Sequence, residues 1–216
     1  FLPEARESSA WLAGAVYLVM PWSWMFVLVT TDTPLILFMA LSAYAYLRAS
    51  DCSGRGTGWY ALAGLFVGLA FLSKYFAALL GLAYAVHVLG WRRERWWALP
   101  LMFVLALPSI GINLGFNATH GWSNVMFNVF NRNEGSSWNL ETLGVYVAMA
   151  LYLLTPWLLW RALAARPDVP GVSRTTARTL LVLWLFPLAV FLLLSARRTI
   201  GLHWVLGFVP LFVVWA

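Results

Sequence analysis

Charged residues are scarce in this chain of 216 residues. Asp, Glu, Lys and Arg together make up 10% of the sequence, whereas hydrophobic residues make up 62% and the mean hydropathy is +0.78. Soluble domains carry about 25% charged residues. The shortage therefore excludes an ordinary soluble domain and predicts an integral membrane protein, in which the few ionisable side chains mark candidate functional sites.

Cysteine is also nearly absent, and the single Cys52 cannot form a disulfide within the chain. The sequence contains no GxGxxG, P-loop, HExxH, CxxC or GxSxG pattern. These absences identify no cofactor and leave a divalent metal open. The formal charge of +6 does not indicate a nucleic-acid partner, because Arg between apolar stretches records membrane orientation.

The two ends of the chain do not look like natural termini. The first nine residues are polar, do not start with Met and lead to no cleavage site, while the last residues lie in an apolar run. We therefore expect residues 1–216 to form a single transmembrane domain fragment, truncated at both ends.

The apolar stretches predict an all-α fold, a polytopic membrane protein with about eight transmembrane helices of a larger bundle. One helix over 59–90 would be about 48 Å long, well beyond a hydrocarbon core of about 30 Å, so a break is predicted at 73–75. The predicted spans are 11–29, 35–50, 59–73, 75–90, 98–116, 142–160, 180–196 and 204–216.

Alternation of these spans divides the 14 Lys and Arg residues unevenly. Ten fall on one side of the membrane, and the other side holds Lys74, Arg132, Arg197 and Arg198. The positive-inside rule makes the first side cytoplasmic. The four remaining cations are then extracytoplasmic.

An outside loop at about 117–141 is long enough to hold structure of its own. Its large apolar residues are spaced like one face of a helix that lies in the membrane interface. These residues are Trp122, Met126, Phe127 and Phe130.

Asp32 and Lys74 are candidate site residues on this outer side. Asp32 precedes Pro34 where a span begins, which is typical of a helix N-cap and equally of an acid with a further role. Lys74 either snorkels to the interface or binds an anionic headgroup, since an ammonium is a compact charge for phosphate. As an interfacial residue, Lys74 is expected to contribute little to folding.

The adjacent Arg197 and Arg198 oppose the positive-inside tendency and suggest that an anion binds between helix ends. The alternative is that the two arginines are a chance exception to the charge asymmetry. His87 is interpreted as structural. Other polar residues are possible pocket members, although loop polarity explains them equally well: Asn117, His120, Arg132 and His203. Together these residues predict an extracytoplasmic pocket that suits a lipid-linked phosphate.

Four motifs in this order resemble those of a known family. They are T-D-x-P-L at 31–35, G-L-x-x-G-L-x-x-L-S-K-Y at 64–75, N-x-x-H-x-W at 117–122, and a basic and aromatic stretch at 197–204 with Pro210 beyond it. The chain resembles glycosyltransferases of the dolichyl-phosphate-mannose–protein mannosyltransferase type (GT-C, glycosyltransferase family 39-like). Within that superfamily it is similar to the bacterial branch that includes the lipid A aminoarabinose transferases.

The resemblance implies transfer of a hexose or pentose from a polyprenyl-phosphate carrier to a lipid, protein or glycan acceptor on the extracytoplasmic face. It implies a multi-pass protein of the bacterial inner membrane, acting in protein glycosylation or lipid A modification of the cell envelope. The implied partners are the lipid-linked donor and membrane lipids, and the sequence does not define the sugar or the acceptor.

The resemblance also implies roles for individual residues. Lys74, Arg197 and Arg198 would bind the donor phosphate, and Asp32 would be a catalytic acid that orients acceptor or donor. The family's principal carboxylate base lies upstream of Phe1, so the fragment alone is expected to be inactive. The alternative is a non-catalytic membrane carrier or transporter of lipid-linked sugars.

Overall fold

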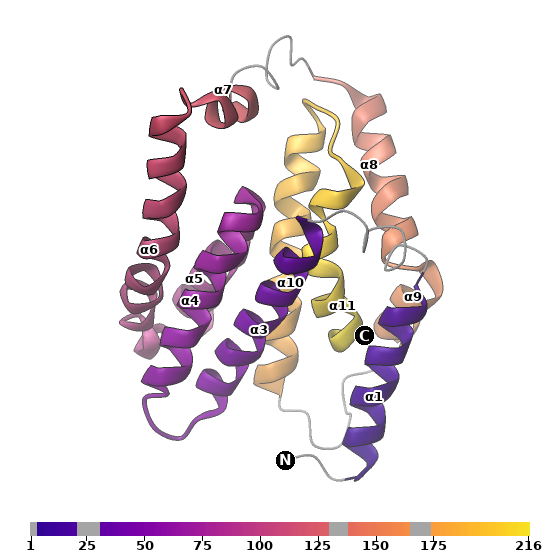
Figure 1. Cartoon of the computed structure of the whole chain (residues 1–216). Helices are drawn as coiled ribbons and strands as arrows, with labels where there is room; N and C mark the ends of the chain where they lie inside the picture. The colour runs from indigo at the N-terminus through magenta and orange to yellow at the C-terminus, as the bar shows by residue number, and fades with distance from the viewer. Residues whose placement is uncertain (1–3, 21–30, 130–137, 165–173) are drawn as a thin grey trace.

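A computed structural model describes residues 4–20, 31–129, 138–164 and 174–216, and all regular structure within these ranges is helical (Figure 1). The prediction of an all-α fold is therefore confirmed for the described residues. The α-helices are α1 (Glu4–Val19), α3 (Asp32–Asp51), α4 (Thr57–Ser73), α5 (Ala78–Trp91), α6 (Ala98–Thr119), α7 (Ser123–Val129), α8 (Leu140–Leu153), α9 (Pro156–Ala164), α10 (Arg174–Ser195) and α11 (Val209–Trp215). Short 3₁₀ helices are η1 (Tyr75–Ala77), η2 (Arg93–Arg95), η4 (Leu202–Trp204) and η5 (Leu206–Phe208).

Two of the described helices, α6 and α10, are long and apolar enough to cross a membrane by length and composition. Each has 22 residues, whereas other apolar helices, including α4, α5 and α8, have 10–17 residues. Eight transmembrane helices therefore remain a prediction. The second half of the predicted span 11–29 lies outside the described residues.

The predicted span 142–160 is not one helix. Helix α8 ends at Leu153, Thr155 has a left-handed backbone with φ of 51°, and α9 begins at Pro156. A proline in the first turn of a helix lacks the N–H that would continue the preceding helix. The apolar pattern does not show this interruption, because the residues on both sides of it are hydrophobic.

The break predicted at 73–75 is confirmed. Helix α4 ends at Ser73, Lys74 is extended with φ of −155° and ψ of 139°, and η1 leads into α5. Both backbone groups of Lys74 are hydrogen-bonded: its N–H donates to the carbonyl of Ala70 (3.0 Å), and its carbonyl accepts from the N–H of Ala77 (3.1 Å). The break is a closed turn rather than a frayed helix end.

Helix α4 packs closely on α6 because two glycines face it. A Cβ on Gly64 would lie 2.3 Å from the carbonyl oxygen of Met102, and a Cβ on Gly68 would lie 2.9 Å from the Cα of Ala106. Small residues four apart let helix backbones approach each other in a membrane. The glycines of the G-L-x-x-G-L motif thus hold α4 against α6, and α4 also packs on α3.

The turns that follow α3 and α5 meet at one end of the bundle. Arg95 donates to the carbonyl of Arg55 (2.7 Å), and Thr176 at the start of α10 donates to the carboxylate of Asp51 (3.4 Å). The start of α3, the 73–75 break and the end of α10 lie at the other ends of the same helices (Figure 1). This is the alternation that the predicted spans require.

Candidate functional site

Asp32 and Lys74 are in direct contact. Asp32 is the first residue of α3, and its Oδ1 accepts a hydrogen bond from the ammonium of Lys74. The N-cap position belongs to Thr31, which makes no side-chain capping bond. Asp32 is wholly buried, whereas 16% of the Lys74 side chain is exposed. The acid is thus enclosed, and the lysine lies between it and the surface.

The burial of Asp32 changes the expectation that Lys74 contributes little to folding. Removing one partner of a buried ion pair leaves an uncompensated charge and costs about 3–5 kcal/mol. The second oxygen of Asp32, Oδ2, is buried and has no hydrogen-bond partner among the residues that the structure describes. Lys74 is the described partner of this carboxylate, so we expect Lys74 to contribute to folding.

Tyr75, the residue after Lys74, contacts α6. The side-chain amide of Asn117 donates to the hydroxyl of Tyr75 (3.3 Å) and to the backbone carbonyl of Asn113 (2.8 Å). Asn117 is almost fully buried, with 1% of its surface exposed. This contact brings the third motif to the second, as a shared pocket requires.

Phe76, the next residue, contacts the segment that follows α10. Its ring lies 4.3 Å from the ring of Trp204, and the guanidinium of Arg198 lies 5.7 Å from the centre of the same indole. A guanidinium over an indole face is a favourable cation–π arrangement. Arg198 is thereby connected through one aromatic ring to the turn that contains Lys74.

Arg197 is directed to a different neighbour. Its guanidinium lies 5.3 Å from the ring of Trp138, which precedes α8, and the residue is exposed where Arg198 is half-buried. The two adjacent arginines are therefore not equivalent. Of the two, Arg198 is joined to the turn at Lys74.

The remaining predicted pocket residues are placed less centrally. His120 is exposed, and its Nδ1 lies 2.8 Å from the carbonyl of Phe116 in its own helix, on whose ring it also stacks. His203 lies beside Trp204, with ring centres 6.3 Å apart. Arg132 lies outside the described residues.

Three consecutive residues, Lys74 to Phe76, thus contact three different parts of the fold. We call this turn the 74–76 hub: it reaches α3 through Asp32, α6 through Asn117, and the 198–204 segment through Trp204. The sequence analysis gave Tyr75, Phe76 and Trp204 no individual role. The available signal was that Tyr75 and Phe76 follow Lys74 and that Trp204 follows His203.

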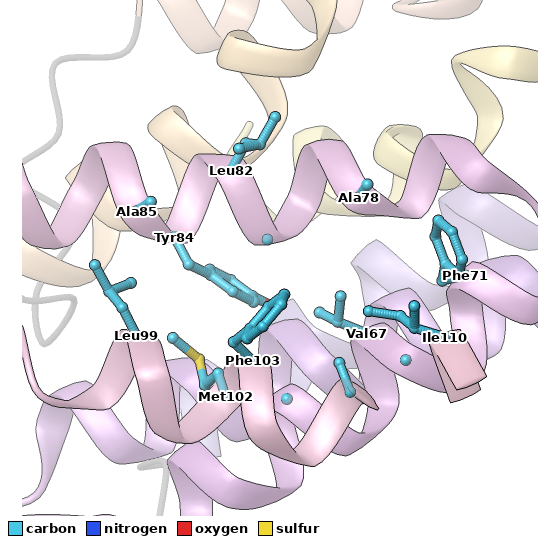
Figure 2. A pocket seen from close by; sticks show the side chains of 14 residues that line it. Val67, Phe71, Ala78, Leu82, Tyr84, Ala85, Leu99, Met102, Phe103 and Ile110 are labelled. Atoms are coloured by element: carbon cyan, nitrogen blue, oxygen red, sulfur yellow. The ribbon is translucent and has the colours of Figure 1, made fainter. Parts of the chain in front are cut away.

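An apolar cavity of about 390 Å³ lies between α4, α5 and α6 (Figure 2). Figure 2 shows Phe71, Ala78 and Ile110 at one end of it and Leu99 and Ala85 at the other. None of the predicted site residues lines this cavity. Its end at Phe71 and Ala78 nevertheless flanks Lys74 in the sequence.

Among the described residues, no group of three or more His, Cys, Asp or Glu side chains could hold a metal ion.

The family model for dolichyl-phosphate-mannose-protein mannosyltransferase matches residues 5–113. The chain belongs to this family. The match makes it a GT-C type glycosyltransferase-family chain, and the matched range contains both Asp32 and Lys74. The other predicted site residues, from Asn117 to His203, lie beyond it. No curated protein and no solved structure matches the chain.

Proposed function

We propose that this chain carries the donor-phosphate site of a membrane glycosyltransferase that moves a sugar from a polyprenyl-phosphate carrier to an acceptor on the extracytoplasmic face. The observation that carries the proposal is the buried Asp32–Lys74 pair, which joins two motifs inside the family-matched range. Burying two charges costs desolvation free energy that their mutual attraction does not always repay. A stabilising role alone is therefore a weak explanation for this pair.

The proposed chemistry follows from the charges at the hub. When the glycosidic bond to phosphate breaks, negative charge grows on the phosphate that leaves. A fixed cation stabilises that charge more in the transition state than in the ground state, which accelerates the reaction. Lys74 is the proposed cation, and the enclosed Asp32 is the proposed acid that orients the reactants through Lys74, which it holds in position.

Lys74 does not suffice alone, because Asp32 already neutralises it. A donor phosphate brings a further negative charge, and a second cation is needed to balance it. Arg198 is the proposed second cation, since Trp204 and Phe76 connect it to the hub. Arg197, Asn117, His120, Arg132 and His203 are proposed as peripheral members of the same pocket.

The membrane arrangement is part of the proposal. The apolar helices would cross the membrane as one transmembrane domain, with the hub and the 117–141 loop, which includes α7, on the extracytoplasmic side of a bacterial inner membrane. The cavity between α4, α5 and α6 has the apolar lining that the hydrocarbon chain of the donor requires.

The test is a transfer assay with the complete enzyme in native membranes. Polyprenyl-phosphate pentoses and hexoses, labelled in the sugar, are supplied, and both free polyprenyl phosphate and labelled acceptor are measured. An enzyme releases polyprenyl phosphate in step with acceptor labelling, and Lys74→Gln lowers both. Movement of an intact donor across the membrane without cleavage would instead identify the carrier.

A further inference from the structure

His87 in α5 joins three helices through its two ring nitrogens. Nδ1 lies 2.7 Å from the hydroxyl of Tyr46 in α3, and Nε2 lies 3.0 Å from the hydroxyl of Thr179 in α10. The three side chains are completely buried. None of them belongs to the hub, which lies at the opposite ends of these helices.

One arrangement of protons satisfies the whole group. The hydroxyl of Thr179 donates its proton to the carbonyl of Thr175 (2.8 Å), so Nε2 of His87 must be the donor to Thr179 Oγ1. Nδ1 then accepts from the hydroxyl of Tyr46. The imidazole is therefore neutral, with its proton on Nε2. A buried polar network with every member satisfied disfavours other packings, which leave a polar atom unpaired.

A second set of bonds extends the network to α4. The hydroxyl of Ser42 in α3 donates to the carbonyl of Ala63 in α4 (2.8 Å), and the hydroxyl of Tyr84 in α5, 2.8 Å away, then donates to Ser42. The rings of Tyr84 and Tyr46 are stacked with centres 4.1 Å apart. Side-chain hydrogen bonds thus connect α4, α3, α5 and α10.

The same helices carry the charges of the hub. Asp32 begins α3, Lys74 lies at the turn before α5, and Arg198 follows α10. At a rise of 1.5 Å per residue, Tyr46 lies about 20 Å from Asp32 along α3, and His87 lies about 20 Å from Lys74. Helix α3 is therefore joined to α5 by the hydrogen bonds of His87 and of Ser42, and to the turn before α5 by the Asp32–Lys74 pair.

Burial of apolar surface provides little driving force between membrane helices, because lipid tails are as apolar as the side chains, so packing and hydrogen bonds determine how the helices associate. Hydrogen bonds fix how far one helix slides along another, since they weaken steeply with distance and angle. We propose that His87 is a positioning residue: with Tyr46 and Thr179 it sets the axial register of α3, α5 and α10, and so places Lys74 and Arg198 around one phosphate. The placement of Lys74 and Arg198 around a phosphate rests on the proposed function, whereas the role of His87 in the helix register does not.

The register is tested by a distance measurement that needs no activity. Spin labels are attached to cysteines at the exposed Leu37 in α3 and Leu193 in α10, in a Cys52→Ser background. Tyr46→Phe and Thr179→Val each remove one hydroxyl with little change in shape. We expect both to shift or broaden the label-to-label distance.

Two matched variants are expected to keep the original distance. Thr179→Ser retains the hydroxyl that His87 needs, and Tyr44→Phe removes the hydroxyl of an exposed tyrosine on the same helix as Tyr46. Unchanged distances in Tyr46→Phe and Thr179→Val would overturn the register proposal, even in a protein that transfers no sugar.

Transfer kinetics test the consequence for the site. Displacement of reacting groups by about 1 Å can cost 10²-fold, so we expect kcat per folded molecule to fall by at least about 10-fold in Thr179→Val and to recover in Thr179→Ser. In a background that carries both Lys74→Gln and Arg198→Gln, the same Thr179→Val change should alter kcat less than about two-fold, because both cations to be positioned are gone.

A purely structural role predicts a different result. Thr179→Val would then reduce the amount of folded protein while kcat per folded molecule stays at the wild-type value, and that outcome would overturn the positioning role. If the wild-type enzyme transfers no sugar from any donor, the proposed function fails and the distances alone decide the register.

Discussion

The ammonium of Lys74 donates a hydrogen bond to the carboxylate of Asp32, a residue 42 positions earlier in the chain. The contact joins the first residue of α3 to the extended residue that separates α4 from η1. Because the acid is wholly buried and the lysine is not, the pair presents a cation toward the surface while its counter-charge stays inside.

Substitution of Lys74 should affect catalysis and stability at once. Lys74→Gln is expected to lower kcat by about 10²–10³-fold, the loss seen when one preorganised electrostatic group is removed. It should also destabilise the protein by about 3–5 kcal/mol, since Asp32 is left buried and unpaired. Thermal stability in detergent and transfer kinetics measure the two effects.

The double variant Asp32→Asn/Lys74→Gln separates these effects. With both charges removed, thermal stability should return to near the wild-type value, whereas kcat should stay as low as in Lys74→Gln. Near wild-type transfer by a stable double variant would show that the pair serves the fold alone.

The two arginines after α10 should differ in importance. Arg198 is connected to the hub through Trp204, whereas Arg197 faces Trp138. We expect Arg198→Gln to lower kcat/KM for the donor by about 10²-fold, in the range for loss of one charge stabiliser. Arg197→Gln is the matched comparison, with an effect below about three-fold. Equal losses in side-by-side kinetics would contradict the assignment.

Filling the apolar cavity should weaken binding of long-chain donors. A Cβ on Gly81 would meet only the side chain of Val67, at 3.7 Å, so Gly81→Leu can extend into the cavity without a backbone clash. We expect its KM for a long-chain donor to rise about 10-fold, because the donor chain would lose apolar contacts worth about 1–2 kcal/mol of binding free energy. KM for a donor with two isoprene units should change little.

A control for the cavity variant exists on the same helix. A Cβ on Gly90 would meet nothing within 4 Å, and Gly90 does not line the cavity. Gly90→Leu should leave both KM values unchanged. The cavity would have no role in donor binding if Gly81→Leu raised both KM values equally.

Single-cysteine labelling tests the membrane orientation. In a Cys52→Ser background, cysteines at Thr33 and Thr199 should react with an impermeant maleimide from outside intact cells, and one at Gly54 should not. Gly54 is preferable to Gly56, whose φ of 64° and close approach to Ala49 would strain a side chain. External labelling at Gly54 would reverse the orientation and place the hub on the cytoplasmic face.

The helix break at Lys74 could be predicted from the sequence, because it follows from a length limit. An uninterrupted helix over 59–90 exceeds the membrane core, and the stretch has one charged residue at which to break. The break between α8 and α9 could not be predicted in the same way. Pro156 is a signal for a helix end, but Pro108 and Pro187 lie inside α6 and α10, so a proline alone does not show which stretch is interrupted.

The contacts of the hub could not be predicted from the sequence either. Sequence analysis predicted that Asp32 and Lys74 share a side of the membrane, and their roles stay predictions. That they touch, and that Arg198 and Arg197 face different indoles, depends on how α3, α4 and α10 pack. The hydrophobic pattern defines which faces are apolar, but not the rotation or register of one helix against another.

The closed turn at Lys74 has a consequence for biogenesis. From Thr57 to Trp91 the chain contains one charged residue, and it lies at the apex of a helical hairpin. A lysine at the centre of a membrane helix costs about 2.5–3.5 kcal/mol, whereas each Leu, Ile, Phe or Val there contributes about 0.3–0.6 kcal/mol in favour of insertion. In the proposed orientation, we expect the hairpin to insert as one unit and its apex lysine to meet Asp32 only after crossing the membrane, so that the ion pair forms late in assembly.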